Sequence, residues 1–243
     1  EVTDKNSYWN FYKGSLLFSV GTAKFLDYPI RDMVIDLKKE SKGYILNSAK
    51  ATFPGNTRIG FEGKFKNDFT IFEGYSTFNS DNIRDFCKWV SIDLNNISDS
   101  RLRQTKINSS VVIRKGGATF AGISGIIDSS NISGEVILRF QELNNLAANL
   151  KIDNLNVDAY IEKNTEEKSL GDNKDFEIFN FDSLNINLDI SQALLLKNQY
   201  NNIKINSVYK NKILHIDELK ILDFAKGNLK LYGNIDFNNK KEI

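Results

Sequence analysis

The sequence predicts a mainly β protein whose repeated antiparallel strands form a curled, groove-like sheet with one or two short helices. Apolar residues alternate with polar or small ones in several segments, as in a strand with one buried face. The chain also contains 17 Phe and 9 Tyr, residues that favour strands. An open groove and a closed β-sandwich both satisfy this pattern, because alternation defines the faces of a strand but not the topology of the sheet.

Five segments show the alternation clearly, and each is interpreted as one strand. Their apolar positions are Leu16, Phe18 and Val20; Ile59, Phe61 and Phe65; Val136, Leu138 and Phe140; Leu184, Ile186, Leu188 and Ile190; and Leu229, Leu231, Ile235 and Phe237. Residues 151–161, KIDNLNVDAYI, predict a further alternating strand. Turn signals separate the strands: KESKG at 39–43, PGN at 54–56, KGG at 115–117 and YKNK at 209–212.

One helix is predicted near residues 81–90, with Ser80 or Asp81 as its cap. Its apolar residues, at helical spacing, are Ile83, Phe86, Cys87 and Val90. A weaker helical turn is predicted at 191–197, and residues 143–150 fit either a helical turn or an irregular start of a strand. Residues 162–174 lack any apolar period and predict a solvated loop or hairpin tip.

Residues 15–65 and 183–236 form an approximate internal repeat. Each copy runs through an alternating strand, a tyrosine, two further strands and a Gly-Asn pair, and ends in a strand that contains a late glycine. Repeated strand units predict an extended array in which neighbours cover one another's edges. We therefore expect residues 1–243 to be a single elongated β-rich segment, and we interpret it as part of a longer protein.

Charge and cysteine content exclude some classes of protein. The 32 basic residues nearly balance the 31 acidic ones, so a nucleic-acid partner is not indicated. A single cysteine excludes an internal disulfide. The chain contains neither a signal peptide nor an apolar run of about 18 residues, so any membrane anchor is expected outside this segment.

The residues of common catalytic sites are scarce. His215 is the only histidine and falls in a predicted strand, and Cys87 fits the apolar face of the predicted helix. Asp153 and Asp158 resemble a glycosidase pair only in residue type, because such aspartates on alternating strands fit a solvated polar face. The sequence therefore predicts a non-enzymatic segment without metal or cofactor.

A β-sandwich that binds a glycan or protein ligand is the alternative function. Such a module usually exposes an aromatic platform, and the clustered candidates are Trp9, Tyr12 and Trp89. The glycine-rich stretch at 115–125 is not a dinucleotide motif, and we interpret it as bulges or tight turns between strands.

Several segments resemble the AsmA-like family of Gram-negative envelope proteins. The clearest is LNVDAYI at 155–161, which is similar to a recurring leucine-aspartate-tyrosine segment of the family. FPGNTRIGFEGKF at 53–65 resembles the family's turn followed by a strand with a late glycine, and residues 78–94 resemble its strand and short helix. In the latter, Val90-Ser91 stands where the family has Leu-Gly. The closing residues 215–236 are similar to its repeated leucine-glycine unit.

This resemblance implies a periplasmic protein that is anchored in the inner membrane by a helix outside this segment. It also implies that an apolar β-groove carries phospholipid acyl chains between the inner and outer membranes and that the protein supports outer-membrane assembly. The expected partners are lipid acyl chains and envelope proteins of either membrane. Our candidates for the groove lining are Ile59, Phe61, Phe65, Leu184, Ile186, Leu188, Leu229, Leu231 and Ile235.

Overall fold

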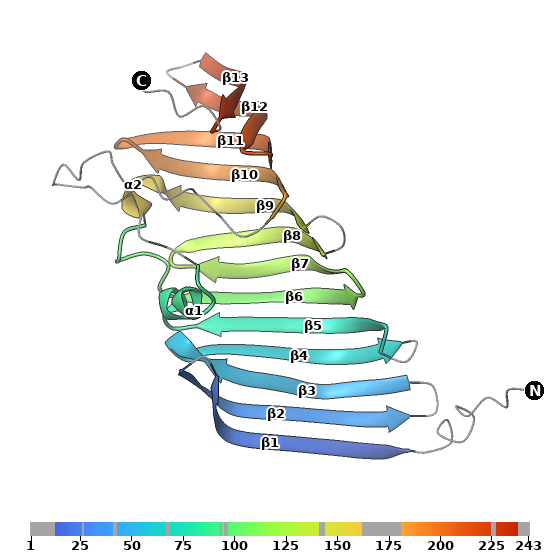
Figure 1. Cartoon of the computed structure of the whole chain (residues 1–243). Helices are drawn as coiled ribbons and strands as arrows, with labels where there is room; N and C mark the ends of the chain where they lie inside the picture. The colour runs from blue at the N-terminus through green and yellow to red at the C-terminus, as the bar shows by residue number, and fades with distance from the viewer. Residues whose placement is uncertain are drawn as a thin grey trace, which may run out of the picture.

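The chain forms one open sheet of 13 strands, arranged in the order of the sequence (Figure 1). This computed structural model describes residues 13–25, 27–40, 43–66, 69–92, 94, 97–140, 144–161, 181–224 and 227–237. The strands are β1 (Gly14–Phe25), β2 (Tyr28–Glu40), β3 (Gly43–Phe53), β4 (Thr57–Lys66), β5 (Ile71–Ser80), β6 (Thr105–Arg114), β7 (Gly117–Ile127), β8 (Ser130–Phe140), β9 (Asn144–Asn156), β10 (Ser183–Leu195), β11 (Asn198–Lys210), β12 (Ile213–Phe224) and β13 (Gly227–Asp236). The helical elements are η2 (Pro54–Asn56), α1 (Ile83–Trp89) and α2 (Val157–Tyr160).

Neighbouring strands pair antiparallel, with one exception. β9 and β10 pair in parallel, so the end of β9 and the start of β10 lie at opposite ends of the strands. The exception divides the sheet into two antiparallel series, β1–β9 and β10–β13. The two copies of the predicted repeat correspond in position to β1–β4 and β10–β13, each with four consecutive antiparallel strands.

The predicted fold class is confirmed: the protein is mainly β, with an open sheet and short helices. Within the described residues the strands form one sheet, whereas a β-sandwich has two facing sheets. The predicted turns at PGN, KGG and YKNK all join adjacent strands, and PGN forms η2. Residues 117–125 of the glycine-rich stretch belong to β7, whose pairing with both neighbours contains register shifts.

Three local predictions were wrong or incomplete. Residues 191–195 belong to β10 and 196–197 form a turn, because the pairing of Ala193 with Tyr200 extends the hairpin through the predicted helical turn. The alternating strand predicted to end at residue 161 stops at Asn156, where the Asn156 side chain accepts a hydrogen bond from the Ala159 N–H and starts α2. Of the two possibilities for residues 143–150, the described part is strand β9.

Helix α1 lies where the sequence predicts a helix, with a different cap. Asn82 occupies the N-cap position, while Ser80 is the last residue of β5 and Asp81 follows it. Cys87 is buried as expected, but Val90 lies beyond the helix and is exposed. The loop predicted at 162–174 lies outside the described residues.

Two glycines allow β4 and β5 to approach closely. Gly63 and Gly74 are directly opposed. A Cβ atom built on Gly74 would lie 2.0 Å from the Glu62 carbonyl oxygen, and one on Gly63 would lie 2.3 Å from the Glu73 carbonyl oxygen. A side chain at either position therefore forces the two backbones apart.

We expect Gly74→Ala to destabilise the protein by about 1–3 kcal/mol, because the added methyl group overlaps backbone rather than a movable side chain. Gly21→Ala is the matched control in β1, since no atom lies within 4 Å of a Cβ built there. Urea denaturation of both variants measures the difference. Equal stability of the two variants would contradict the close approach.

Candidate functional site: one apolar face of the sheet

The strand register places one apolar residue opposite another across ten strands. Opposed residues in paired strands have side chains on the same face of the sheet. One row of opposed residues runs from β4 to β13 through Phe65, Phe72, Ile113, Ala118, Leu138, Leu146, Leu184, Tyr209, Leu214 and Ile235. A second row runs through Ile59, Phe78, Ile107, Gly125, Ile132, Ile152, Ile190, Ile203, Ile221 and Leu229. These rows define what we call the apolar face.

All nine predicted lining residues belong to this face. Five of them lie in the two rows just given. Leu188 and Leu231 belong to a shorter row that also contains Ile205 and Leu219. Ile186 lies opposite Ala148 on β9, and Phe61 lies two residues from Ile59 on the same strand. The structure thus brings residues from β4, β10 and β13 onto one surface.

The opposite face of the sheet is polar. Its opposed pairs include Lys64 with Glu73, Asn108 with Ser124, and Asp189 with Lys204. The Lys204 Nζ and Asp189 Oδ2 atoms lie 3.9 Å apart. Because side chains alternate along a strand, these charged and polar pairs lie on the face opposite the apolar rows. A few apolar residues share that face, such as Ile126, which is 45% exposed.

The apolar face is only partly covered. Two clusters are packed on it, one around Leu46, Phe72 and Val111 and the other around Ile190, Ala193 and Ile203. On this face the Ile113 side chain remains 38% exposed. Leu231 and Ile235 remain 42% and 46% exposed. Among the described residues, no second sheet packs across this face.

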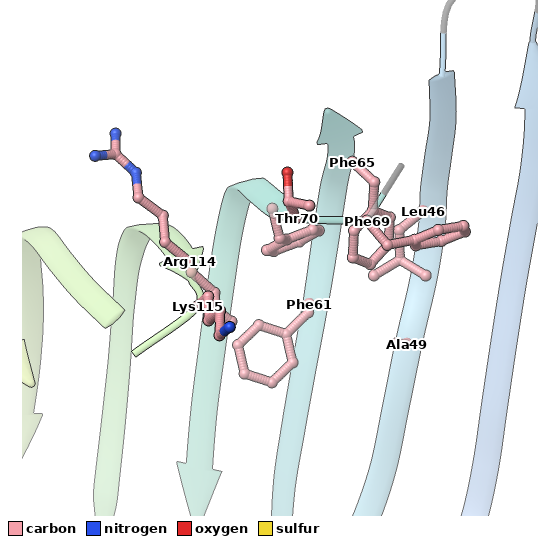
Figure 2. Close-up of a pocket in the computed structure, with 10 residues that line it drawn as sticks. Leu46, Ala49, Phe61, Phe65, Phe69, Thr70, Arg114 and Lys115 are labelled. Carbon is pink, nitrogen blue, oxygen red and sulfur yellow. The ribbon is translucent and has the colours of Figure 1, made fainter. Parts of the chain in front are cut away.

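A hollow of about 470 Å³ opens on the apolar face between β3 and β6. It is lined by Leu46, Ala49, Phe61, Phe65, Phe69, Thr70, Phe72, Ile113, Arg114 and Lys115 (Figure 2). The Phe65 and Phe72 ring centroids lie 5.0 Å apart, and those of Phe61 and Phe72 lie 6.4 Å apart. Its volume falls within the usual range for small-molecule sites, about 300–1,000 Å³.

Both helices lie at the other end of the strands (Figure 1). Phe86 of α1 makes edge-to-face contacts with Phe53 and Phe78, and Trp89 packs against Phe53 and Phe25. Phe78 belongs to the apolar face, so α1 covers that face beside the ends of β3 and β5. Val157 of α2 packs similarly against the cluster around Ile190. This end of the face is therefore covered, whereas the end with the hollow is open.

Trp89 is consequently part of an aromatic cluster rather than an exposed platform. Its indole Nε1 is buried and has no hydrogen-bond partner within the described part of the chain. The other platform candidates, Trp9 and Tyr12, lie outside the described residues.

The aspartates that resembled a catalytic pair hold neighbouring backbone segments in place. Asp153 accepts hydrogen bonds from the backbone and side chain of Asn131, and these bonds lower the pKa of its carboxyl group. Asp158 accepts from the N–H groups of Leu196 and Lys197, at 2.6 and 2.7 Å. Asp153 thus satisfies a backbone donor at the start of β8, and Asp158 satisfies two in the β10–β11 turn.

His215 contacts a residue of the neighbouring strand, and Cys87 is buried in a helix. The His215 Nδ1 atom lies 2.7 Å from Asn234 Oδ1, across the β12–β13 pair. Cys87 is buried in α1, and burial raises the pKa of its thiol. Among the described residues, no three or more His, Cys, Asp or Glu side chains gather closely enough to hold a metal ion.

Several residues of this face were not identified from the sequence. Phe72, Phe78, Ile107 and Ile113 complete the rows across β5 and β6, but glycine and serine interrupt their alternation. The signal for this strand face was the spacing of Phe72 and Phe78, since six positions place both side chains on the same face of one strand. Lys115 lies in the predicted turn and Arg114 directly precedes it, and nothing in the sequence marked them as neighbours of Phe61.

No family model matches this chain, and neither the curated proteins nor the solved structures contain a significant match. None of the described helices has the length and apolar character required to cross a membrane.

Tyr160 of α2 forms a hydrogen bond at the helical end of the sheet, and this bond depends on pH. Its hydroxyl donates to Asp128 Oδ2 at 3.0 Å, and Asp128 also accepts from the N–H groups of Leu102 and Arg103. Burial, followed by the hydrogen bond to Asp128 and its negative charge, raises the Tyr160 pKa from 10.0 to about 12. The fold therefore favours the neutral phenol.

We expect Tyr160→Phe to flatten the alkaline part of the stability profile. The stabilisation linked to Tyr160 is fully present below pH 10, the ordinary pKa, and is lost as the pH rises towards about 12. Denaturation of both proteins at a series of pH values measures the difference, with the values near pH 8 as a baseline. Parallel profiles above pH 10 would refute the linkage.

Proposed function

We propose that this segment is a non-enzymatic lipid-transfer element, whose apolar face carries phospholipid acyl chains between membranes. The observation that supports this most directly is the pair of apolar rows that cross ten strands without a charged side chain. An exposed apolar surface of this extent in a protein generally marks an interaction site. Hydrocarbon needs apolar area rather than directional bonds, which this surface provides.

The dimensions of the sheet suit a path rather than a single pocket. Twelve spacings of about 4.8 Å make the sheet about 58 Å wide across 13 strands. The hydrocarbon of one leaflet is about 15 Å thick, half of a bilayer core of about 30 Å. A lipid tail is therefore much shorter than the apolar rows and has room to move along them.

The energetics require no chemical step. Each methylene group removed from water contributes about 0.8 kcal/mol, so ten methylenes contribute about 8 kcal/mol. Successive positions along the rows present similar apolar side chains, so a tail that slides from strand to strand exchanges like contacts. Fixed polar anchors along the rows would hold the lipid at one position instead.

The cellular setting follows from the resemblance to AsmA-like envelope proteins. We propose a periplasmic location, an inner-membrane anchor outside this segment, and transfer between the inner and outer membranes in support of outer-membrane assembly. Envelope proteins of either membrane are the proposed protein partners. The hydrogen bonds of Asp153 and Asp158 to neighbouring backbone and the cross-strand contact of His215 support the proposal that the segment does not act as an enzyme.

We expect photo-crosslinking probes at Phe61 and Leu231 to capture lipid. Probes at Tyr75 and Tyr232 are matched controls, because they lie on the polar face of β5 and β13 and are 61% and 60% exposed. Crosslinking in lipid-containing membranes, read by mass spectrometry of the adducts, gives the comparison. Equal capture on both faces would contradict a lipid path on the apolar face.

Phe61→Glu and Leu231→Glu should reduce lipid capture while the protein still folds. Leu231 is 42% exposed, so a carboxylate there remains hydrated and should cost less than about 1 kcal/mol of stability. Phe61 packs against the cluster around Phe72 and should cost more. Tyr75→Glu and Tyr232→Glu are the controls. Severe unfolding of both variants, with no lipid captured by the parent protein, would rule out the lipid path.

A further inference from the structure

The open mouth of the hollow combines aromatic and cationic side chains. The hollow lies beside the start of β5 and the end of β6, whereas α1 lies beyond the other end of β5. Arg114 and Lys115 line its mouth. Arg114 follows Ile113 and is opposed to Ile71, so its side chain leaves the end of β6 from the polar face, and its guanidinium extends away from the aromatic rings (Figure 2). The apolar floor and the polar mouth together match the two ends of an amphiphile.

Phe69 forms one wall of the hollow in a strained backbone conformation. Its φ of 69° lies in the left-handed region, which is unfavourable for a bulky residue. The Phe69 ring packs against Tyr44 at 4.2 Å and Phe65 at 4.8 Å between centroids, and these contacts hold it in position. Yet Phe69 remains 48% exposed. Strain of this kind gathers at ligand sites, and here it keeps an aromatic ring at the mouth.

The two cations at the mouth form no ion pair with any described carboxylate, unlike their neighbours at the same end of the sheet. Lys66 pairs with Glu73 at 2.5 Å, and Lys38 pairs with Glu40 at 3.0 Å. Arg114 and Lys115 are exposed and make no such contact. Two positive charges that pair with no described carboxylate therefore stand beside an apolar hollow.

We propose that this hollow selects phospholipids with a net negative headgroup, the phosphate lying against Arg114 and Lys115 and one tail lying among Phe61, Phe65 and Phe72. The selection rests on the proposed lipid function and adds headgroup specificity to it. Arginine presents a planar fork that matches phosphate oxygens, and lysine adds a point charge. A zwitterionic headgroup gains less, because its own cation meets the same two positive side chains.

The test compares Arg114→Gln/Lys115→Gln with the parent protein in binding two short-chain lipids, phosphatidylglycerol and phosphatidylcholine with identical tails. Titration below the micelle concentration gives the affinities. Each basic residue near an anionic lipid contributes about fivefold, so the double variant should bind phosphatidylglycerol about 30-fold more weakly. Its affinity for phosphatidylcholine should stay the same.

Lys210→Gln/Lys212→Gln is the matched control, since these exposed lysines flank the β11–β12 turn at the same end of the sheet but do not line the hollow. This control should leave both affinities unchanged. An equal loss in the two double variants would show a general charge effect and overturn the proposal. Unchanged phosphatidylglycerol binding in Arg114→Gln/Lys115→Gln would overturn it as well.

A third variant separates this proposal from the lipid function itself. If Phe61→Glu weakens both lipids while the parent protein binds them equally, the apolar face carries lipid without headgroup selection. If the parent protein binds neither lipid, both proposals fail. Thermal unfolding of every variant confirms that a loss of binding does not arise from a loss of fold.

Discussion

The structure depends on strand register, because only register keeps one face of the sheet apolar from β4 to β13. A slip of one residue in any pair would turn a whole strand's apolar side chains to the polar face. The register shifts that do occur preserve the face. Leu46 and Ala49 of β3 are three positions apart in the sequence. Their partners are only two positions apart, because Leu46 pairs with Leu37 and Gly63, and Ala49 pairs with Ile35 and Phe61. The inserted residue restores the alternation, so the sheet bends without exchanging its faces.

A single layer must stabilise itself without a second sheet. Apolar neighbours on adjacent strands cover one another, and each opposed pair contributes roughly 0.2–1 kcal/mol. The ends of the strands are secured separately. Arg84 of α1 donates to the carbonyl oxygens of Leu94, Ile97, Ser98 and Arg101, which holds the connection between β5 and β6 beside the sheet. Asp158 holds the β10–β11 turn, where Leu196 and Lys197 both have positive φ. Stability is thus distributed along the sheet, which allows one face to remain open.

The sequence predicts the apolar face well where alternation is uninterrupted. The run from Leu184 to Ile190 gives both the strand and its face correctly, because a period of two has one structural meaning. Residues 191–197, SQALLLK, were misread because alanine and leucine also favour a helix. Their pairing with β11 decides the conformation, and that partner lies outside the segment. Residues 157–160 are helical because the Asn156 side chain accepts a hydrogen bond from the Ala159 N–H. Such a local bond competes with strand pairing, and hydrophobic periodicity does not detect it. Arg114 and Lys115 meet Phe61 and Phe65 only after β4, β5 and β6 pair, so their proximity is a property of the sheet rather than of any segment.

The two ends of the strands differ in a way that orients an amphiphile under the proposed function. At one end, α1 and α2 pack aromatic and aliphatic side chains onto the apolar face, and the nearby carboxylates of Asp128 and Asp158 are occupied by backbone N–H groups. At the other end the face is open, and two cations stand beside the hollow. A tail directed towards the helices and a headgroup at the open end satisfy both ends at once. The row from Phe65 to Ile235 runs parallel to that open end, so a lipid that moves from strand to strand along it keeps its headgroup in water throughout. The asymmetry therefore fixes the orientation of the lipid across the strands while leaving its position along the sheet free.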